Sequence, residues 1–240
     1  MHTGVVRPAG PSLVLAALVA AGPWGCGVGT AAPAVPTCAR GTSDGCVDHS
    51  LYYTVLFNDP SFGGICRSGV SRNSFACDVA ARRFCVAHHF VTGFPTQTSD
   101  TFMRVACFNA PAVEAQVPFA TLVSLNGRCK PSSIYSIYCE EAADRYCLGQ
   151  GLAGGFGPTE YAGGIATIGC FPATMVARIA VSYSAVFELK DFCPGSHYRD
   201  STCDGVSDAY CQNSGAGATG TGPQQLVGDM ATLLCVHPPR

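Results

Sequence analysis

The nine residues Cys77–Cys85 read CDVAARRFC, and the pattern returns as CEEAADRYC at 139–147 and as CDGVSDAYC at 203–211. The three stretches align without a gap. Two further cysteines flank each one, so that cysteines recur at 66, 77, 85 and 107, then 129, 139, 147 and 170, then 193, 203, 211 and 235. The intervals are 11, 8 and 22, then 10, 8 and 23, then 10, 8 and 24. This match predicts three tandem copies of one four-cysteine unit.

One short helix is expected in each copy, between its second and third cysteines. An acidic residue stands in the first turn, at Asp78, Glu140 or Asp204, where it complements the helix dipole. An aromatic residue precedes the third cysteine of each copy, and glycines follow soon after it. The glycines predict a helix end and then an open loop.

Two kinds of strand are expected around that helix. The run into each fourth cysteine is apolar on both faces, as is typical of a central strand; its apolar residues are Val105, Phe108, Ile168, Phe171, Leu233 and Val236. Alternating segments ahead of each first cysteine, at 52–57, 117–123 and 179–187, predict second strands. The predicted fold class is therefore α+β, with three tandem disulfide-stabilised repeats, each having one short helix and about two to three short strands.

Helix geometry limits how the four cysteines of a copy pair. Two cysteines eight residues apart on a helix are separated by about 12 Å along its axis, whereas a disulfide needs Cα atoms within about 7 Å. If the last strand runs antiparallel to the helix, second-to-fourth and first-to-third pairing is favoured. The predicted bridges are Cys77–Cys107, Cys66–Cys85, Cys139–Cys170, Cys129–Cys147, Cys203–Cys235 and Cys193–Cys211, with Cys38–Cys46 at the front. A rival scheme that threads bridges between copies and joins Cys38 to Cys235 stays open.

The N-terminus reads as an export signal. Arg7 is followed by an apolar run at 13–21 and then by a Gly-Pro breaker. This run is too short to span a bilayer. Two processing outcomes stay open: cleavage near Ala31 or Ala32, or retention of Cys26 as a lipid anchor. In both cases we expect a secreted or extracytoplasmic surface protein without a transmembrane span, in an oxidising compartment.

The predicted division of the chain follows the cysteines. Residues 1–32 are the signal segment and linker, 33–65 an N-terminal arm with a truncated repeat, 66–128 repeat 1, 129–192 repeat 2 and 193–240 repeat 3. The apolar content of 48% is enough for packed cores. A charged content of only 12%, together with 28 glycines and 15 cysteines, indicates a loop-rich fold held by cross-links. A net charge of −2 gives no basic face for nucleic acid.

The motif search finds little catalytic chemistry. The sequence has no GxSxG, no HExxH and no phosphate-binding glycine loop, and its cysteine and histidine spacings do not match a metal site, so we expect no metal and no cofactor. His88 and His89 occur in one copy only and are interpreted as helix-end residues. Glu140 or Glu141 could pair with Glu160 as two carboxylates, but solvated helix charge is the favoured interpretation.

The candidate binding residues lie in the glycine-rich segment after each helix. It reads GFPTQ at 93–97, GGFGPTE at 154–160 and GTGPQQ at 220–225, so that three polar residues align. These are Gln97, Glu160 and Gln225, joined by the aromatic residues Phe94 and Phe156. Such a set could form a shallow sugar site, in which the ring stacks and the polar group bonds hydroxyls. The competing interpretation is that the polar group satisfies its own loop while the ring fills the core.

Three functions remain open on this basis. The leading hypothesis is a secreted or surface-anchored, non-catalytic module that binds glycans or cell-envelope components, since three copies of a weak site give avidity. The alternative is a structural or protein-interaction surface protein. A secreted hydrolase is the second alternative, and it would use the non-repeated residues His88, His89, Asp100 and Glu160.

Overall fold

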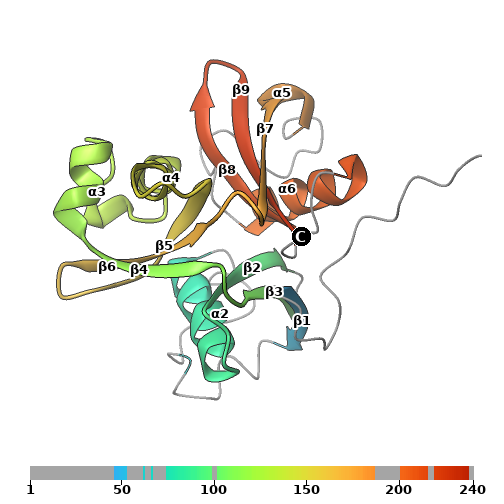
Figure 1. Cartoon of the computed structure of the whole chain (residues 1–240), viewed down its shortest axis with the longest axis horizontal. Helices are drawn as coiled ribbons and strands as arrows, with labels where there is room; N and C mark the ends of the chain where they lie inside the picture. Colours follow the sequence, from blue (N-terminus) through green and yellow to red (C-terminus); the bar gives the residue numbers. More distant parts are fainter. Residues whose placement is uncertain are drawn as a thin grey trace, which may run out of the picture. The chain divides into compact units, whose positions relative to one another are not determined.

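The computed structural model describes residues 46–52, 62, 66, 74–98, 102–186, 201–215 and 219–237. These residues form three antiparallel sheets of three strands each, with helices beside them (Figure 1). The strands are β1 (Cys46–Tyr52), β2 (Thr92–Thr98), β3 (Phe102–Phe108), β4 (Val113–Pro118), β5 (Gly154–Ala162), β6 (Ile165–Phe171), β7 (Val176–Ser182), β8 (Thr219–Val227) and β9 (Met230–Val236). The helices are α2 (Phe75–Ala87), α3 (Phe119–Leu125), the 3-10 helix η2 (Pro131–Ser133), α4 (Ile137–Gly149), α5 (Tyr183–Val186) and α6 (Ser201–Ser214). The α+β prediction is confirmed.

All three sheets share one arrangement. Their strand orders are β1-β3-β2, β4-β6-β5 and β7-β9-β8, so the last strand of each group in the sequence lies in the centre, as its apolar sequence predicts. The fourth cysteine of each copy is the next-to-last residue of its central strand. On the strand that follows the helix, which is β2, β5 or β8, the residue opposite that cysteine is always a glycine. The pairs are Gly93–Cys107, Gly155–Cys170 and Gly220–Cys235.

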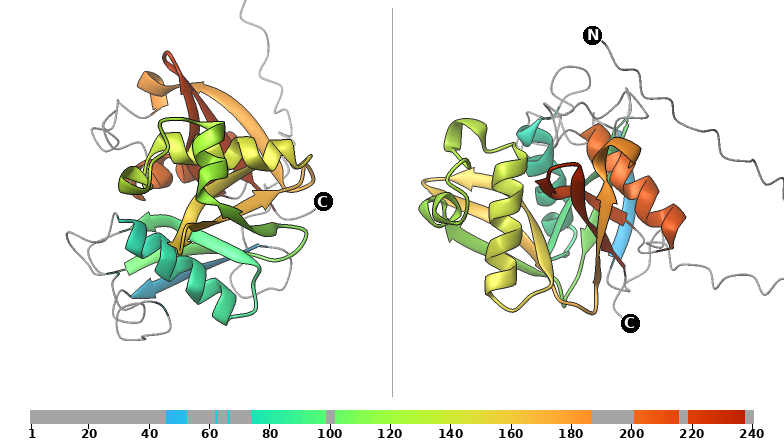
Figure 2. Two further views of the ribbon diagram at one scale, coloured as in Figure 1. Left: turned by 90° about the vertical axis from the view of Figure 1, so that its left-hand side faces the viewer. Right: turned by 90° about the horizontal axis from the view of Figure 1, so that it is seen from above.

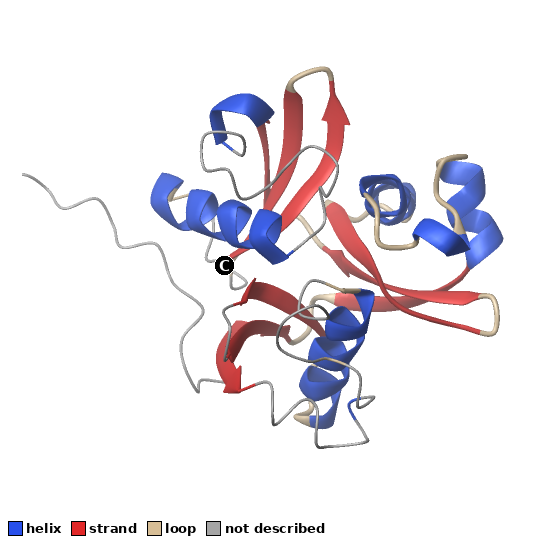
Figure 3. Ribbon diagram, turned by 180° about the vertical axis from the view of Figure 1, so that it is seen from behind, coloured by secondary structure: helices blue, strands red, loops and turns tan. Residues whose placement is uncertain are grey.

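One helix packs on each sheet, as predicted. Helices α2, α4 and α6 contact β2, β5 and β8 respectively, and each red sheet in Figure 3 has a blue helix against it. Alanines in the middle of α2 and α4 are fully buried, so small side chains let these helices lie close to their strands. The contact between α4 and β5 can be followed from two further directions in Figure 2.

The open glycine loop predicted after each helix is wrong, because that segment is a strand. It forms β2, β5 or β8, each of which has a register shift in its middle. Glycine serves close packing here: a Cβ on Gly155 would lie 2.1 Å from Sγ of Cys147, and a Cβ on Gly93 would lie 2.1 Å from Sγ of Cys85. At these two positions the helix cysteine comes so close to the strand that the strand has no room for a side chain.

The predicted disulfide pairing within the three copies is also wrong, while the predicted Cys38–Cys46 bridge lies outside the described residues. The bridges are Cys66–Cys77, Cys85–Cys107, Cys129–Cys139, Cys147–Cys170 and Cys211–Cys235, which join first to second and third to fourth cysteines. Cys203 is disulfide-bonded as well. The exclusion of second-to-third pairing is confirmed, because both cysteines lie on one helix. The error came from strand direction: the unforeseen strand leads away from the helix end, so the central strand returns to that end and meets the third cysteine.

Two of the predicted second strands begin earlier and end sooner than expected. Strand β4 ends at Pro118 and β7 at Ser182, after which helices α3 and α5 begin. Phe119 and Leu122, one helical turn apart, are buried and pack into the core of their sheet, which explains the change from strand to helix. In the first copy Tyr52 closes β1, and residues 53–57 lie outside the described part of the chain.

The core has one cluster for each sheet and a shared cluster that joins all three. The shared cluster includes Phe94 and Phe108 from the first sheet, Phe156 and Phe171 from the second, and Leu234 from the third. Phe94 lies 4.7 Å from Phe156 between ring centroids, and Phe108 lies 5.1 Å from Phe171. These aromatic pairs join the first sheet to the second, and Leu234 packs against the same cluster from the third.

All of the described residues belong to one compact unit of the chain. The outer strands β4 and β7 precede the first cysteine of the copy whose sheet they join, so each of these sheets draws residues from both sides of a predicted boundary at 129 or 193.

Cys26, Cys38, Cys193 and the side chain of Cys46 lie outside the described residues. Five disulfides indicate an oxidising, extracytoplasmic environment. Within the described part, no helix has the length and apolar character needed to cross a bilayer.

Candidate functional site

The three aligned polar residues occupy one structural position. Gln97 pairs with Arg104, Glu160 with Thr167 and Gln225 with Thr232, each on the central strand of its sheet. Each of the three follows the register shift of its strand. The alignment made from the sequence therefore corresponds to a real equivalence in the fold. The side chain of Gln97 lies outside the described part.

The aromatic residues expected to accompany them lie in the core. Phe94 and Phe156 are 4% and 2% exposed, and both belong to the cluster shared by the three sheets. Their rings pack on each other and on Phe108 and Phe171. With the rings in this position, stacking on a ligand is not available to them, and the interpretation in which the aromatic residue fills the core fits the geometry.

Glu160 binds the helix of the preceding copy. Its carboxylate forms ion pairs with Arg82 and Arg83 on α2. Arg82 also donates from Nε to Oε2 of Glu114 on β4, at 2.6 Å. Burial alone would lower the pKa of Arg82, but the hydrogen bonds and charges of Glu114 and Glu160 outweigh it and raise that pKa. Glu160 is thus used inside the protein, where it joins the first two copies.

Gln225 contacts a residue that lines an open pocket. Its Nε2 donates to Oε1 of Glu141 on α4, at 3.4 Å. Glu141 lines a pocket of about 210 Å³ between the start of α4 and the β8–β9 hairpin. The lining residues are Arg128, Ile137, Tyr138, Glu141, Leu226 and Gly228. The pocket therefore combines α4, and Arg128 just before Cys129, with the hairpin of the third sheet, and it places an aromatic ring, a cation and a carboxylate around one small space.

Neighbouring groups hold the polar side chains of this pocket in place. The guanidinium of Arg128 lies over the ring of Tyr138, 5.2 Å from its centroid, and Nη1 donates to the Tyr138 hydroxyl at 3.3 Å. Glu141 forms an ion pair with Arg145, one turn further along α4. Asn126 donates from Nδ2 to Oε2 of Glu141 at 3.0 Å. The side chains that would contact a ligand are thus positioned by contacts within the protein.

The two polar pocket residues on α4, Tyr138 and Glu141, have no counterparts of the same type in the other two copies. Tyr138 precedes the second cysteine of its copy, and the other copies have Ala76 and Thr202 there. Glu141 lies two residues after that cysteine, where the other copies have Val79 and Gly205. A three-fold avidity argument therefore does not apply to this pocket.

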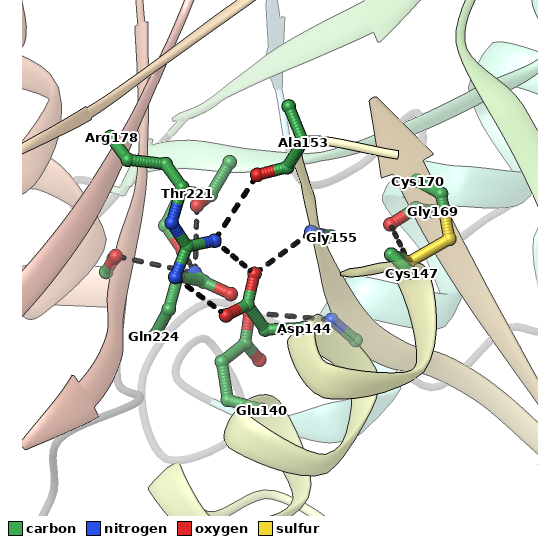
Figure 4. A network of polar contacts seen from close by, with 12 residues as sticks. Glu140, Asp144, Cys147, Ala153, Gly155, Gly169, Cys170, Arg178, Thr221 and Gln224 are labelled. Carbon is green, nitrogen blue, oxygen red and sulfur yellow. Dashed lines mark hydrogen bonds and ion pairs between the residues drawn. A yellow bond between two sulfur atoms is a disulfide. The ribbon is translucent and has the colours of Figure 1, made fainter. Parts of the chain in front are cut away.

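A second polar network joins α4 to the third sheet through two buried acidic residues. Arg178 on β7 donates from Nη1 to Oδ1 of Asp144 at 2.7 Å and from Nη2 to Oδ2 at 2.9 Å (Figure 4). The Gly155 amide also donates to Asp144, and the Gly157 amide donates to Glu140. Asp144 and Glu140 are each 2% exposed, so the interpretation of Glu140 as solvated helix charge is wrong. These acids fix the irregular start of β5.

Among the residues named for a hydrolase, the described ones have contacts of other kinds. His88 contacts the carbonyl of Phe84 through Nδ1 at 2.8 Å, and His89 takes a left-handed conformation with φ of 68°, as residues at a helix end do. Asp100 lies outside the described residues, while Glu160 is held by Arg82 and Arg83. The described residues contain no group of three or more acidic, cysteine or histidine side chains able to hold a metal ion.

Comparison with known proteins adds no family to this picture. No protein-family model matches the chain, and neither a curated protein nor a solved structure matches it significantly.

Sequence reasoning missed Arg128 and Tyr138. It searched for residues that recur between copies, whereas these two occur in one copy only. A search for what distinguishes the second copy would have found the run RCKPSSIYSIYCEE at 128–141, which places an arginine, tyrosines and two glutamates close together.

Proposed function

We propose that this chain is an extracytoplasmic, non-catalytic binding module that holds a terminal sugar residue of a glycan in the pocket at Tyr138. The observation that carries the proposal is the preformed set of Tyr138, Arg128 and Glu141 around one open space. An aromatic ring beside planar polar groups suits a ligand that has an apolar face and several hydroxyls.

The size of the pocket sets the size of the ligand group. Sites for drug-sized ligands are typically about 300–1,000 Å³, and this pocket has about 210 Å³. It is large enough for a single ring and too small for an oligosaccharide. We expect a weak site, because a small ligand group gains few contacts. Biological avidity would then come from several protein chains on one surface.

A glycan-array screen of the oxidised secreted protein tests the proposal. Tyr138→Ala and Glu141→Gln should each weaken binding by about tenfold or more, equivalent to about 1.4 kcal/mol. Lys130→Ala is the matched control, because Lys130 is exposed, lies close in sequence and does not line the pocket. Binding that survives Tyr138→Ala unchanged would place the glycan site elsewhere.

A structural or protein-interaction role is the second candidate. It is favoured by a specific observation: two of the three aligned polar residues, Glu160 and Gln225, contact the helix of the preceding copy. The recurring segment would then serve to join copies. On this alternative the glycan array stays blank, while Glu160→Gln lowers the free energy of unfolding.

A further inference from the structure

Arg128 differs from the other arginines of the described chain. Six arginine side chains are described, and five of them, Arg82, Arg83, Arg104, Arg145 and Arg178, form an ion pair with a carboxylate. Among these six, Arg128 alone has no such partner within the part of the chain that the structure describes; it contacts Tyr138 and lines the pocket. Its remaining guanidinium donors are available to a ligand.

The carboxylate on the other wall is already neutralised. Glu141 pairs with Arg145 and accepts hydrogen bonds from Asn126 and Gln225. Arg128, Arg145 and Glu141 together carry one net positive charge at neutral pH. The pocket therefore favours an anionic ligand over a zwitterion, because an ammonium group near Glu141 would also face Arg145. Hydroxyl groups can still donate to the unused lone pairs of Glu141.

From this arrangement we infer that the pocket is specific for an acidic sugar, whose carboxylate binds Arg128. A planar guanidinium binds a carboxylate with two parallel hydrogen bonds, and the contacts of Arg128 with the ring and hydroxyl of Tyr138 hold its side chain at the pocket in advance. The sugar hydroxyls meet Glu141 and Gln225, and the CH groups of its ring meet Ile137 and Leu226. This inference rests on the proposed function and names the ligand class for that site.

The test is a chemical-shift titration of the oxidised protein with three probes: D-glucuronate, D-glucose and glycine. Glucuronate should shift the resonances of Tyr138 and Leu226, and its affinity should exceed that of glucose by about tenfold or more. Arg128→Gln should remove this preference. Lys130→Gln, which loses the same charge two residues away, should keep it.

The outcomes separate the two claims. If glucose and glucuronate bind equally and Arg128→Gln has no effect, the acidic specificity is wrong while the sugar site stands. Binding of glycine in preference to glucuronate would overturn the sugar assignment and indicate an amino-acid or peptide-end site. The absence of any binding at millimolar concentration would overturn both claims. A fall in glucuronate affinity with added salt, absent in Arg128→Gln, would support the ion pair.

Discussion

Arg178 on β7 binds Asp144 on α4 with two hydrogen bonds, and the same two positions in the preceding junction hold the charges in reverse. There the helix residue is Arg82 and the strand residue is Glu114. Arg82 and Asp144 each lie five residues after the second cysteine of their copy. Glu114 and Arg178 each lie one residue after the strand position that faces the fourth cysteine. One fold thus accepts either orientation of the ion pair between adjacent copies.

Exchanging the charges at Asp144 and Arg178 should therefore be tolerated. Asp144→Arg alone should lower the free energy of unfolding by about 3 kcal/mol, because it leaves two cations facing each other at a buried site. Adding Arg178→Glu should recover a large part of that loss, since Arg82 and Glu114 already show the reversed pair in this setting. Denaturant unfolding of both single variants and the double variant gives the coupling energy.

A third junction, between α6 and the first sheet, provides a comparison for these charge-exchange variants. The equivalent helix residue is Asp208 on α6, and its cation is Arg104 from β3, at 3.7 Å. The strand position equivalent to Glu114 is Asp48, which has the same sign as Asp208. Arg104→Ala should cost less than Arg178→Ala, because its ion pair is longer. Equal costs at the two junctions would contradict the importance of the close pair.

Gly155 should be intolerant of any side chain. A Cβ there would lie 2.1 Å from Sγ of Cys147 and 2.7 Å from the Gly169 carbonyl oxygen, so Gly155→Ala would push the helix away from its strand. Overpacking of this kind costs about 1–3 kcal/mol or more. Gly149→Ala is the matched control, since a Cβ at the end of α4 meets nothing within 4 Å. Denaturant unfolding under oxidising conditions should show a loss for the first variant and no loss for the second.

The two disulfides of the second copy should contribute unequally to stability. Cys147–Cys170 closes a loop of 23 residues and Cys129–Cys139 one of 10. Loop-closure entropy gives about 3.4 and about 2.7 kcal/mol for these lengths. Paired Cys-to-Ala variants, compared by unfolding, should show the larger loss for Cys147–Cys170. Peptide mapping without reduction checks the connectivity itself, and a Cys139–Cys170 peptide would contradict it.

The sequence predicted the parts of the fold that repeat. Cysteine spacing located the helices, and apolar residues around Cys107 and its equivalents identified the central strands. The pairing failed because glycine was interpreted only as a sign of turns. In β2 and β5 it instead admits the cysteine of a neighbouring helix, which is a tertiary requirement invisible in a single stretch of sequence.

Of the candidate pocket, the sequence predicted only a neighbouring residue and none of the residues that line it. Gln225 was identified, and it does contact the pocket residue Glu141. Glu160 was assigned the same role from alignment, yet it lies opposite two arginines and forms ion pairs with them. Equivalent positions share backbone geometry, whereas the side chains they face differ from junction to junction. The pocket itself combines α4 with the β8–β9 hairpin. Its residue Glu141 contacts Gln225, which lies 84 positions further along the chain, so no local pattern predicts that contact.

Asp229 should make the free energy of unfolding depend on pH in the acidic range. Ser182 donates from Oγ to Oδ2 of Asp229 at 2.6 Å, and the Ser184 amide donates to Oδ1 at 2.9 Å. These bonds lower the pKa of Asp229 below its ordinary value of 3.8. The charged form is therefore favoured by folding. Its contribution is present above pH 3.8 and is lost as the pH falls below that value through the lowered pKa of the folded state.

The Asp229→Asn variant isolates this contribution. Its unfolding midpoint should fall below that of the wild type near neutral pH, and the difference should shrink as the pH falls below 3.8 through the lowered pKa of the folded state, because protonation of Asp229 leaves both proteins with a neutral side chain. Ser182→Ala should give an intermediate profile, because the Ser184 amide still binds the carboxylate. Parallel profiles for Asp229→Asn and the wild type across this range would show that the carboxylate gains nothing from its serine partners on folding.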